Sequence, residues 1–135
     1  MCKKALNLLG IARKGGNMAI GEEPVGVAAH GGKARLIILA SDAADHTRRR
    51  AQSYGSLHNT PVISIDADKA QLGAMFGRSA VAMAAVTEIK LAKSFLEALS
   101  EPDRYAGALA AVTEKAETIA LRKQKKPRRR EQVKR

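Results

Sequence analysis

The sequence predicts an α/β fold in which helices cover both faces of a small central sheet. Segments with helical spacing and segments typical of strands alternate along the chain, and short connections join them. The chain has 135 residues, enough for one compact domain, and 45% of them are hydrophobic. Because it contains two Phe, two Tyr and no Trp, its core must be mainly aliphatic.

The first part of the chain predicts two helices and two strands. Apolar residues recur at helical spacing in Lys3–Arg13, and a pair of glycines follows this helix. Met18–Ile20 is expected to form a short strand, and Glu22–His30 a helix that ends at two further glycines. Leu36–Ala40 is apolar at every position, which is typical of a strand buried on both faces.

The middle of the chain predicts one more helix and one more strand. Asp42 is expected to cap a helix that runs through Tyr54, because Asp is a favourable N-cap residue. Gly55 is expected to end this helix. Pro61–Ile65 is expected to form the third strand.

The next segment repeats the alternation. The segment Asp66-Ala67-Asp68 is expected to cap a helix whose inward side includes Phe76. Val81–Val86 is the fourth expected strand. A fifth helix is expected from Thr87 to Leu99, with apolar residues at helical spacing.

The end of the chain changes in composition and predicts a basic tail. The formal net charge is +11, and residues 122–135 hold nine basic residues against Glu131. We expect a domain at residues 1–100 and a helical extension at 101–121. The basic tail at 122–135 is expected to be disordered when free. Such an excess of positive charge favours nucleic acid, or less often an anionic membrane surface, as the partner.

Features of several other protein classes are missing from the sequence. The single Cys2 excludes an internal disulfide, and no apolar run reaches the roughly 18 residues of a membrane span. The apolar N-terminal stretch is broken by Asn7 and ends in two basic residues. We therefore interpret it as the first helix of a cytoplasmic protein, not as a signal peptide.

No catalytic, metal or cofactor site is expected. The three histidines do not fall in a metal-ligand spacing with Cys2 or with one another. Gly31-Gly32-Lys33 has some likeness to a phosphate-binding loop. However, Ala34 stands where Ser or Thr would bind magnesium, and a strand follows it. The aromatic residues lie at helical positions and offer no stacking platform for bases.

The turn into the second helix is the strongest candidate for a binding site. Gly21 permits a close approach of the backbone, and the free N–H groups at a helix start can bind a phosphate. Glu22 or Glu23 could accept hydrogen bonds from a guanine. Alternatively, the two carboxylates only stabilise the positive end of the helix dipole. The residues alone leave both interpretations open.

Further polar and basic residues are candidates for the same surface. The loops expected to open on one edge of the sheet contain Asn17, Gly21–Glu23, Asp42 and Arg78–Ser79. Flanking phosphates would be held by Arg13, Lys14, Lys33, Arg35 and Arg78, unless these residues only form a solvated surface. Phosphate contacts from the tail would come from Arg122, Lys123, Lys125, Lys126, Arg128, Arg129 and Arg130.

Several short motifs, in this order, resemble the kink-turn-binding ribosomal protein superfamily, the L-seven-Ae and L-thirty-e group. Its small bacterial YlxQ-type members are the most similar. The motifs are Ala12–Asn17, Ile20–Glu23, Gly32–Ala43, Asn59–Val62, Leu72–Gly77 and Ala84–Thr87. The resemblance implies a three-layer α-β-α sandwich with a small central four-stranded mixed sheet, here followed by a C-terminal helix and the basic tail. It also implies binding to structured RNA, especially kink-turns.

The resemblance also assigns roles by position, with differences. The family's Gly-x-Asn-Glu loop corresponds to Gly21–Pro24, so Glu23 replaces the asparagine and Pro24 the glutamate. Ile20 stands where strong binders have a lysine, and the apolar wall of the family corresponds to Arg78–Ala80. Since these differences change the hydrogen-bonding groups of the loop, kink-turn specificity is not assumed.

The leading hypothesis is a monomeric, cytoplasmic, non-enzymatic RNA-binding protein associated with the ribosome or ribosomal RNA. An alternative is an adaptor that docks another protein through the helix containing Leu109, Val112 and Ile119. An RNA-modifying enzyme is not expected, because few residues follow the domain.

Overall fold

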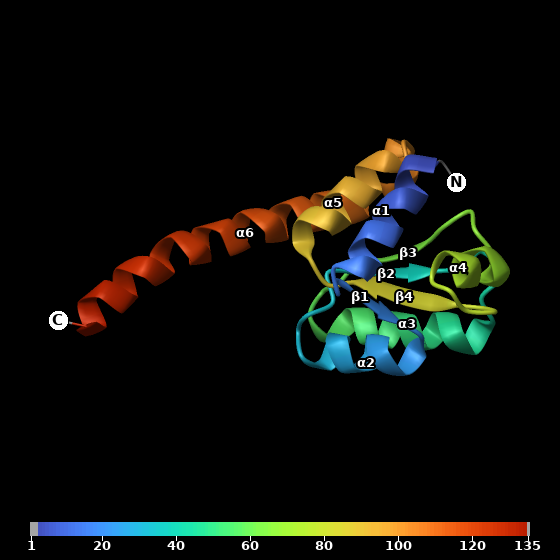
Figure 1. The fold of residues 1–135 in the computed structure, drawn as a ribbon, viewed down its shortest axis with the longest axis horizontal. Coiled ribbons are helices and arrows are strands. Elements are labelled where there is room, and N and C mark those ends of the chain that lie inside the picture. The colour runs from blue at the N-terminus through green and yellow to red at the C-terminus, as the bar shows by residue number, and fades with distance from the viewer. Residues whose placement is uncertain (1–2, 135) are drawn as a thin grey trace.

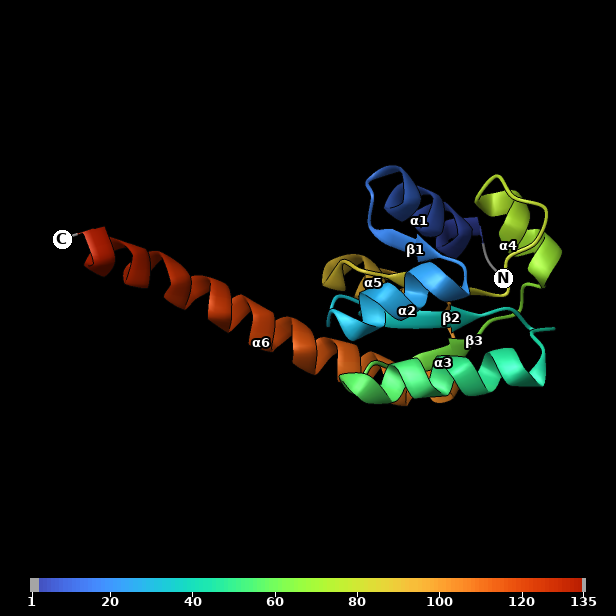
Figure 2. The same ribbon diagram turned by 90° about the horizontal axis from the view of Figure 1, so that it is seen from below.

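The computed structural model describes the backbone of residues 3–134 and the side chains of residues 3–101 and 103–122. Helices and strands form three layers, and the last helix extends away from them (Figures 1 and 2). The elements are α1 (Lys3–Lys14), β1 (Met18–Ile20), α2 (Glu22–His30), β2 (Leu36–Leu39), α3 (Asp45–Leu57), β3 (Val62–Ser64), α4 (Lys69–Met75), β4 (Met83–Val86), α5 (Ile89–Ala98) and α6 (Pro102–Lys134).

The central sheet has the strand order β1-β4-β2-β3. Strand β4 is antiparallel to both of its neighbours, with Ala85 paired to Ala19 on one side and Ile37 on the other. Strands β2 and β3 are parallel. Because β1, β2 and β3 all run in the direction opposite to β4, their C-terminal ends lie at one edge of the sheet. Their N-terminal ends lie at the opposite edge.

Strand β2 shows why both faces of the sheet are covered. Its four residues are all buried, and successive side chains point to opposite faces. Ile38 belongs to a large core with α1, α4, α5 and α6, whereas Ile37 belongs to a smaller core with α2 and α3. Figure 1 shows α2 and α3 below the sheet and α1 and α5 above it. The predicted sandwich around a four-stranded mixed sheet is confirmed.

The third helix begins and ends differently from the prediction. Helix α3 begins at Asp45 with Ala44 as its N-cap, so the prediction that Asp42 caps it is wrong. Oδ1 of Asp42 instead accepts a hydrogen bond from the backbone N–H of Lys69, at the start of α4, at 2.8 Å. The loops after the parallel strands β2 and β3 meet at one edge, which brings these two groups together. Helix α3 also continues past Gly55, where its end was expected.

Helix α6 contributes side chains to the large core, although it follows the expected domain. Tyr105 is 5% exposed and Val112 is 1% exposed, and both belong to this core. The helix has a kink at Tyr105, whose hydroxyl donates a hydrogen bond to the Ser64 carbonyl at 2.9 Å. Arg104 contacts Asp66 at 2.8 Å and the same carbonyl at 3.0 Å. The start of α6 is therefore attached to the end of β3.

The C-terminal part of α6 projects from the sandwich (Figure 1). The expected disorder of residues 122–135 in the free protein stays a prediction. Within the described part of the chain, no helix combines the length and the apolar character that crossing a bilayer requires.

Candidate RNA-binding surface

The turn between β1 and α2 has the open geometry that its glycine predicts. Gly21 adopts φ +102° and ψ 160°, a conformation that favours glycine. Its N–H donates to the Met83 carbonyl at 2.9 Å, and its carbonyl accepts from the N–H of Val25 at 3.1 Å. Since Gly21 has no side chain with which to cap α2, the first N–H groups of this helix are left for water or a ligand.

One guanidinium group lies close to this turn, and a second lies beside the loop that carries it. Nη1 of Arg78, in the loop before β4, donates to the Ile20 carbonyl at 3.3 Å. The same nitrogen is 3.8 Å from the position that a Cβ on Gly21 would occupy. Nη2 of Arg13, near the end of α1, is 3.5 Å from the Cβ position of Gly77, the residue before Arg78. Both arginines are exposed, so each retains N–H groups that can donate to a phosphate.

Sequence reasoning missed a third arginine in this region. Nη1 of Arg50 in α3 forms an ion pair with Oε2 of Glu22 at 3.3 Å, and the two side chains are 56% and 31% exposed. Glu23 is exposed and, among the described residues, has no ion pair. Three consecutive arginines lie in the first half of α3, and this run was the available signal. Arg48, from the same run, donates to the Ser41 carbonyl at 2.8 Å and supports the loop after β2.

The structure separates the predicted site residues onto two edges of the sheet. The edge where β1, β2 and β3 end, which we call the α2 edge, contains Gly21–Glu23, Asp42 and Arg78–Ser79. The opposite edge, where these strands begin, contains Lys14, Asn17, Lys33 and Arg35. The prediction that the Asn17 loop opens beside Gly21 is therefore wrong. Strand β1 lies between them, with its start paired to the end of β4.

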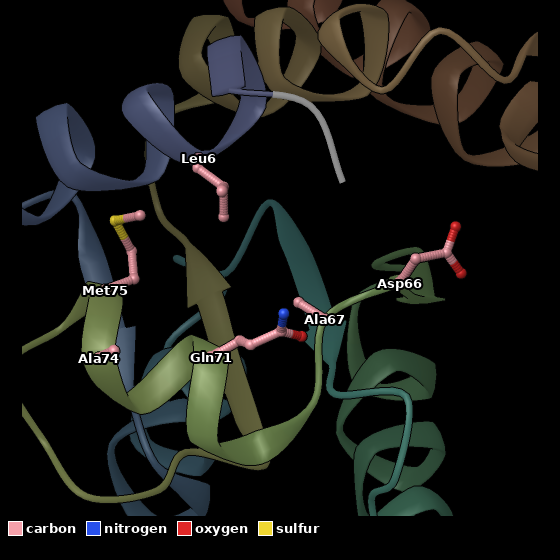
Figure 3. A pocket seen from close by; sticks show the side chains of 6 residues that line it. All are labelled: Leu6, Asp66, Ala67, Gln71, Ala74 and Met75. Atoms are coloured by element: carbon pink, nitrogen blue, oxygen red, sulfur yellow. The ribbon is translucent and has the colours of Figure 1, made fainter.

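A hollow of about 430 Å³ lies between α1 and α4, away from the α2 turn (Figure 3). Leu6 and Met75 point into the space between the two helices, whereas the carboxylate of Asp66 turns away from it. That carboxylate pairs with Arg104. The lining of the hollow is mainly apolar, with Gln71 and Asp66 as its polar members. Among the described residues, no cluster of His, Cys, Asp and Glu is suited to hold a metal ion.

Comparisons with known proteins agree with this architecture. The RNA-binding protein YlxQ of Enterococcus faecium is 28% identical over 76 residues, which cover 56% of this chain and 73% of that protein. A structure from Bacillus halodurans, described as a protein with unknown function, has a TM-score of 0.66 and 28% identity. The match covers 73% of this chain and 98% of that one.

A more distant structure shares the fold. The 15.5kD RNA binding protein of Giardia lamblia has a TM-score of 0.57 and 22% identity, and the match covers 73% of this chain and 83% of that one. The model of the ribosomal protein L7Ae/L30e/S12e/Gadd45 family matches residues 3–96, from α1 into α5. This match spans most of the sandwich, and the chain therefore belongs to the ribosomal protein L7Ae/L30e/S12e/Gadd45 family.

Proposed function

We propose that this protein is a cytoplasmic, non-enzymatic protein that binds structured RNA through its α2 edge. The observation that carries the proposal is the meeting of three kinds of group at one exposed turn. The open start of α2 and the guanidinium groups of Arg13 and Arg78 suit phosphates. The carboxylates of Glu22 and Glu23 suit hydrogen-bond donors on a base edge. Family membership and the RNA-binding relative YlxQ support RNA as the ligand.

Kink-turn recognition, in ribosomal or other structured RNA, is the finer part of the proposal. Ile20 has no charge where strong binders in the family carry a lysine. Arg78 brings a guanidinium to the carbonyl of that residue. We therefore propose that Arg78 supplies the positive charge that Ile20 lacks at this turn. This assignment is compatible with a kink-turn whose backbone passes over the α2 turn.

The test is a binding titration against a panel that contains a kink-turn and stem-loops of equal length. Arg78→Ala is expected to weaken binding to every RNA, because phosphate contacts are independent of sequence. Glu23→Ala is expected to change the ranking of the RNAs more than their mean affinity. Glu97→Ala, an exposed carboxylate on α5, is the control. Equal effects of the two glutamate variants on every RNA would contradict base recognition by Glu23.

Glu22 needs a separate variant, because it is paired with Arg50. Glu22→Ala removes a carboxylate and also frees the Arg50 guanidinium for a phosphate. We expect a changed RNA preference together with tighter binding to all RNAs at low salt. A variant that lacks both carboxylate and cation, Glu22→Ala with Arg50→Ala, should keep the changed preference and lose the tighter binding. Loss of both effects in that double variant would show that Glu22 acts only through Arg50.

The basic tail is proposed to add phosphate contacts without sequence preference. Deletion of residues 122–135 removes a net charge of +8 and should weaken binding to all RNAs on the panel. The dependence of log Kd on log salt concentration should become shallower, because fewer counterions are released. A slope equal to that of the full chain would refute this role.

The structure argues against the alternative function, the docking of another protein through α6. Val112 is buried in the core of the domain, and Leu109 and Ile119 pack against that core. The apolar side that was expected to face a partner is therefore largely occupied. Purification with and without nuclease distinguishes the two functions: co-purifying RNA supports the proposal, whereas a stoichiometric protein retained after nuclease treatment contradicts it.

A further inference from the structure

A second basic site lies at the edge opposite the α2 turn, between α6 and the loops that precede β2 and β3. The structure has a groove of about 320 Å³ there. Its polar lining comprises Arg35, His58, Asn59, Glu114, Lys115, Thr118 and Arg122. Arg35 enters from the loop before β2, and Lys115 and Arg122 come from α6. Residues far apart in the sequence thus form one surface.

The walls of this groove are held by contacts that do not involve a ligand. The backbone N–H of Arg35 donates to the Val86 carbonyl at 2.8 Å, which fixes the start of β2 against β4. Nζ of Lys115 donates to the His58 carbonyl at 3.3 Å and joins α6 to the end of α3. Val112, one helical turn before Lys115, is buried in the core. The groove is therefore already formed before any ligand binds.

The groove carries positive charge that the described residues do not neutralise. Burial, and then the charges of Arg35 and Arg122, lower the pKa of Lys115. None of these three cations forms a salt bridge within the described part of the chain. Glu114 is the one carboxylate in the lining, so the net charge of the groove is positive. Grouped like charges oppose folding, and a bound anion would offset this cost.

We infer that this groove binds the sugar-phosphate backbone of RNA, as a second contact point on the same molecule that the α2 edge recognises. Guanidinium and ammonium groups donate to phosphate oxygens, and the Asn59 and Thr118 side chains suit phosphate or ribose oxygens. A protein partner fits less well, since Ala111 and Ile119 are the apolar members of the lining and no aromatic anchor is among them.

The distance between the two sites is compatible with one RNA. The edges are separated by the length of the strands, about 13 Å for four residues. A double-stranded-RNA-binding domain contacts about 16 base pairs of an A-form helix, so a single structured RNA is long enough to contact both edges. Helix α6 lies outside the matched family segment of residues 3–96. The second site is therefore built from the family domain and a helix added to it.

This inference rests on the proposed RNA binding, and its test uses the full chain with charge-removing variants. Arg35→Gln with Lys115→Gln should weaken binding to structured RNA by about tenfold for each residue. The slope of log Kd against log salt should fall by about two, or one for each phosphate contact. Lys4→Gln, on the exposed face of α1, removes one positive charge outside the groove, as each single groove substitution does inside it, and should change neither quantity by much.

A crosslinking experiment gives a readout that does not depend on stability. A photoreactive benzophenone residue at Thr118, in the groove, should crosslink to the bound RNA. The same group at Glu117, which is exposed and lines a different surface of α6, should crosslink far less. Crosslinks from position 118 to a protein instead of RNA in cells would overturn the inference.

The outcomes separate this inference from the proposed function. If the wild-type chain binds no RNA on the panel, both fail. The groove inference alone fails under a different set of results. The wild type then binds RNA and Arg78→Ala weakens this binding, whereas the groove double variant behaves like Lys4→Gln and position 118 gives no crosslink. A tenfold or larger loss with a shallower salt slope, together with a crosslink from position 118, supports it.

Discussion

The substitution Val112→Ala tests whether α6 belongs to the folded domain. Val112 is 1% exposed, so the substitution deletes the equivalent of two buried methylene groups. At about 0.8 kcal/mol for each group, the lost transfer free energy is roughly 1.6 kcal/mol. The cavity left behind raises the expected loss in the free energy of unfolding to about 2–3 kcal/mol. The higher helix propensity of Ala returns about 0.5 kcal/mol.

Val27→Ala is a matched control for this measurement. Val27 lies in α2 and is 72% exposed, so the same atoms are removed and the same helix propensity is gained without a cavity. Urea unfolding followed by circular dichroism should show Val112→Ala less stable than Val27→Ala by about 2–3 kcal/mol, with an unchanged m value. A difference below about 0.5 kcal/mol would mean that α6 does not pack on the core in solution. The groove beside Lys115 would then lose one of its walls.

Three more predictions follow from a backbone contact of α4 and from two pKa values in α6. A Cβ on Gly73 would lie 2.7 Å from the Arg78 carbonyl oxygen, so Gly73→Ala should lower the free energy of unfolding by about 1–3 kcal/mol and weaken RNA binding; wild-type values in both assays would contradict this. Burial raises the pKa of Tyr105 above its usual 10.0, so the unfolded chain loses this proton first and stability should fall as pH rises above about 10. Tyr105→Phe should remove that fall in urea titrations between pH 8 and 11, and an equally steep fall in the variant would refute this. At neutral pH the variant should lose about 1 kcal/mol of the free energy of unfolding, because its hydrogen bond to Ser64 is missing. The lowered pKa of Lys115 acts in the opposite direction: the unfolded chain keeps this proton to a higher pH, so the free energy of unfolding should rise as pH approaches 10.5. Lys115→Gln should reduce that rise, and an unchanged pH profile in this variant would contradict the shift.

Local patterns predicted the elements of the sandwich well. Strand β1 and helix α2 agree with the prediction at both ends, and the apolar run in β2 correctly indicated a strand covered on both faces. The main error concerned Asp42, whose carboxylate has two possible helix starts nearby in space. Sequence distance favoured α3, whereas the pairing of β2 with β3 brings the N–H of Lys69 within 2.8 Å. A cap that acts across a sheet edge leaves no signal in the adjacent residues.

Some features of the candidate site could likewise be predicted from local sequence, and others depend on tertiary contacts. The Gly21 turn was predictable, because a glycine followed by acidic residues at a helix start has local physical consequences. The ion pair of Arg50 with Glu22 was not, since it joins two helices that pack together only on the sheet. Arg35 and Lys115 are likewise far apart in the sequence and meet in one groove. The resemblance to the family supplied the fold but did not extend to α6.

By itself, the sequence determined the elements, the need for a sheet covered on both faces, and the glycine turn that opens α2. These properties depend on spacings of a few residues and on the conformational freedom of single residues, which a linear chain contains directly. Only the tertiary structure decided which loops share an edge, which carboxylates are paired and where basic residues gather. The central position of β4, antiparallel to both neighbours, places the loop before β4 beside the end of β1, so that Arg78 reaches the Ile20 carbonyl. Strand order arises from long-range pairing and burial, which local periodicity does not specify.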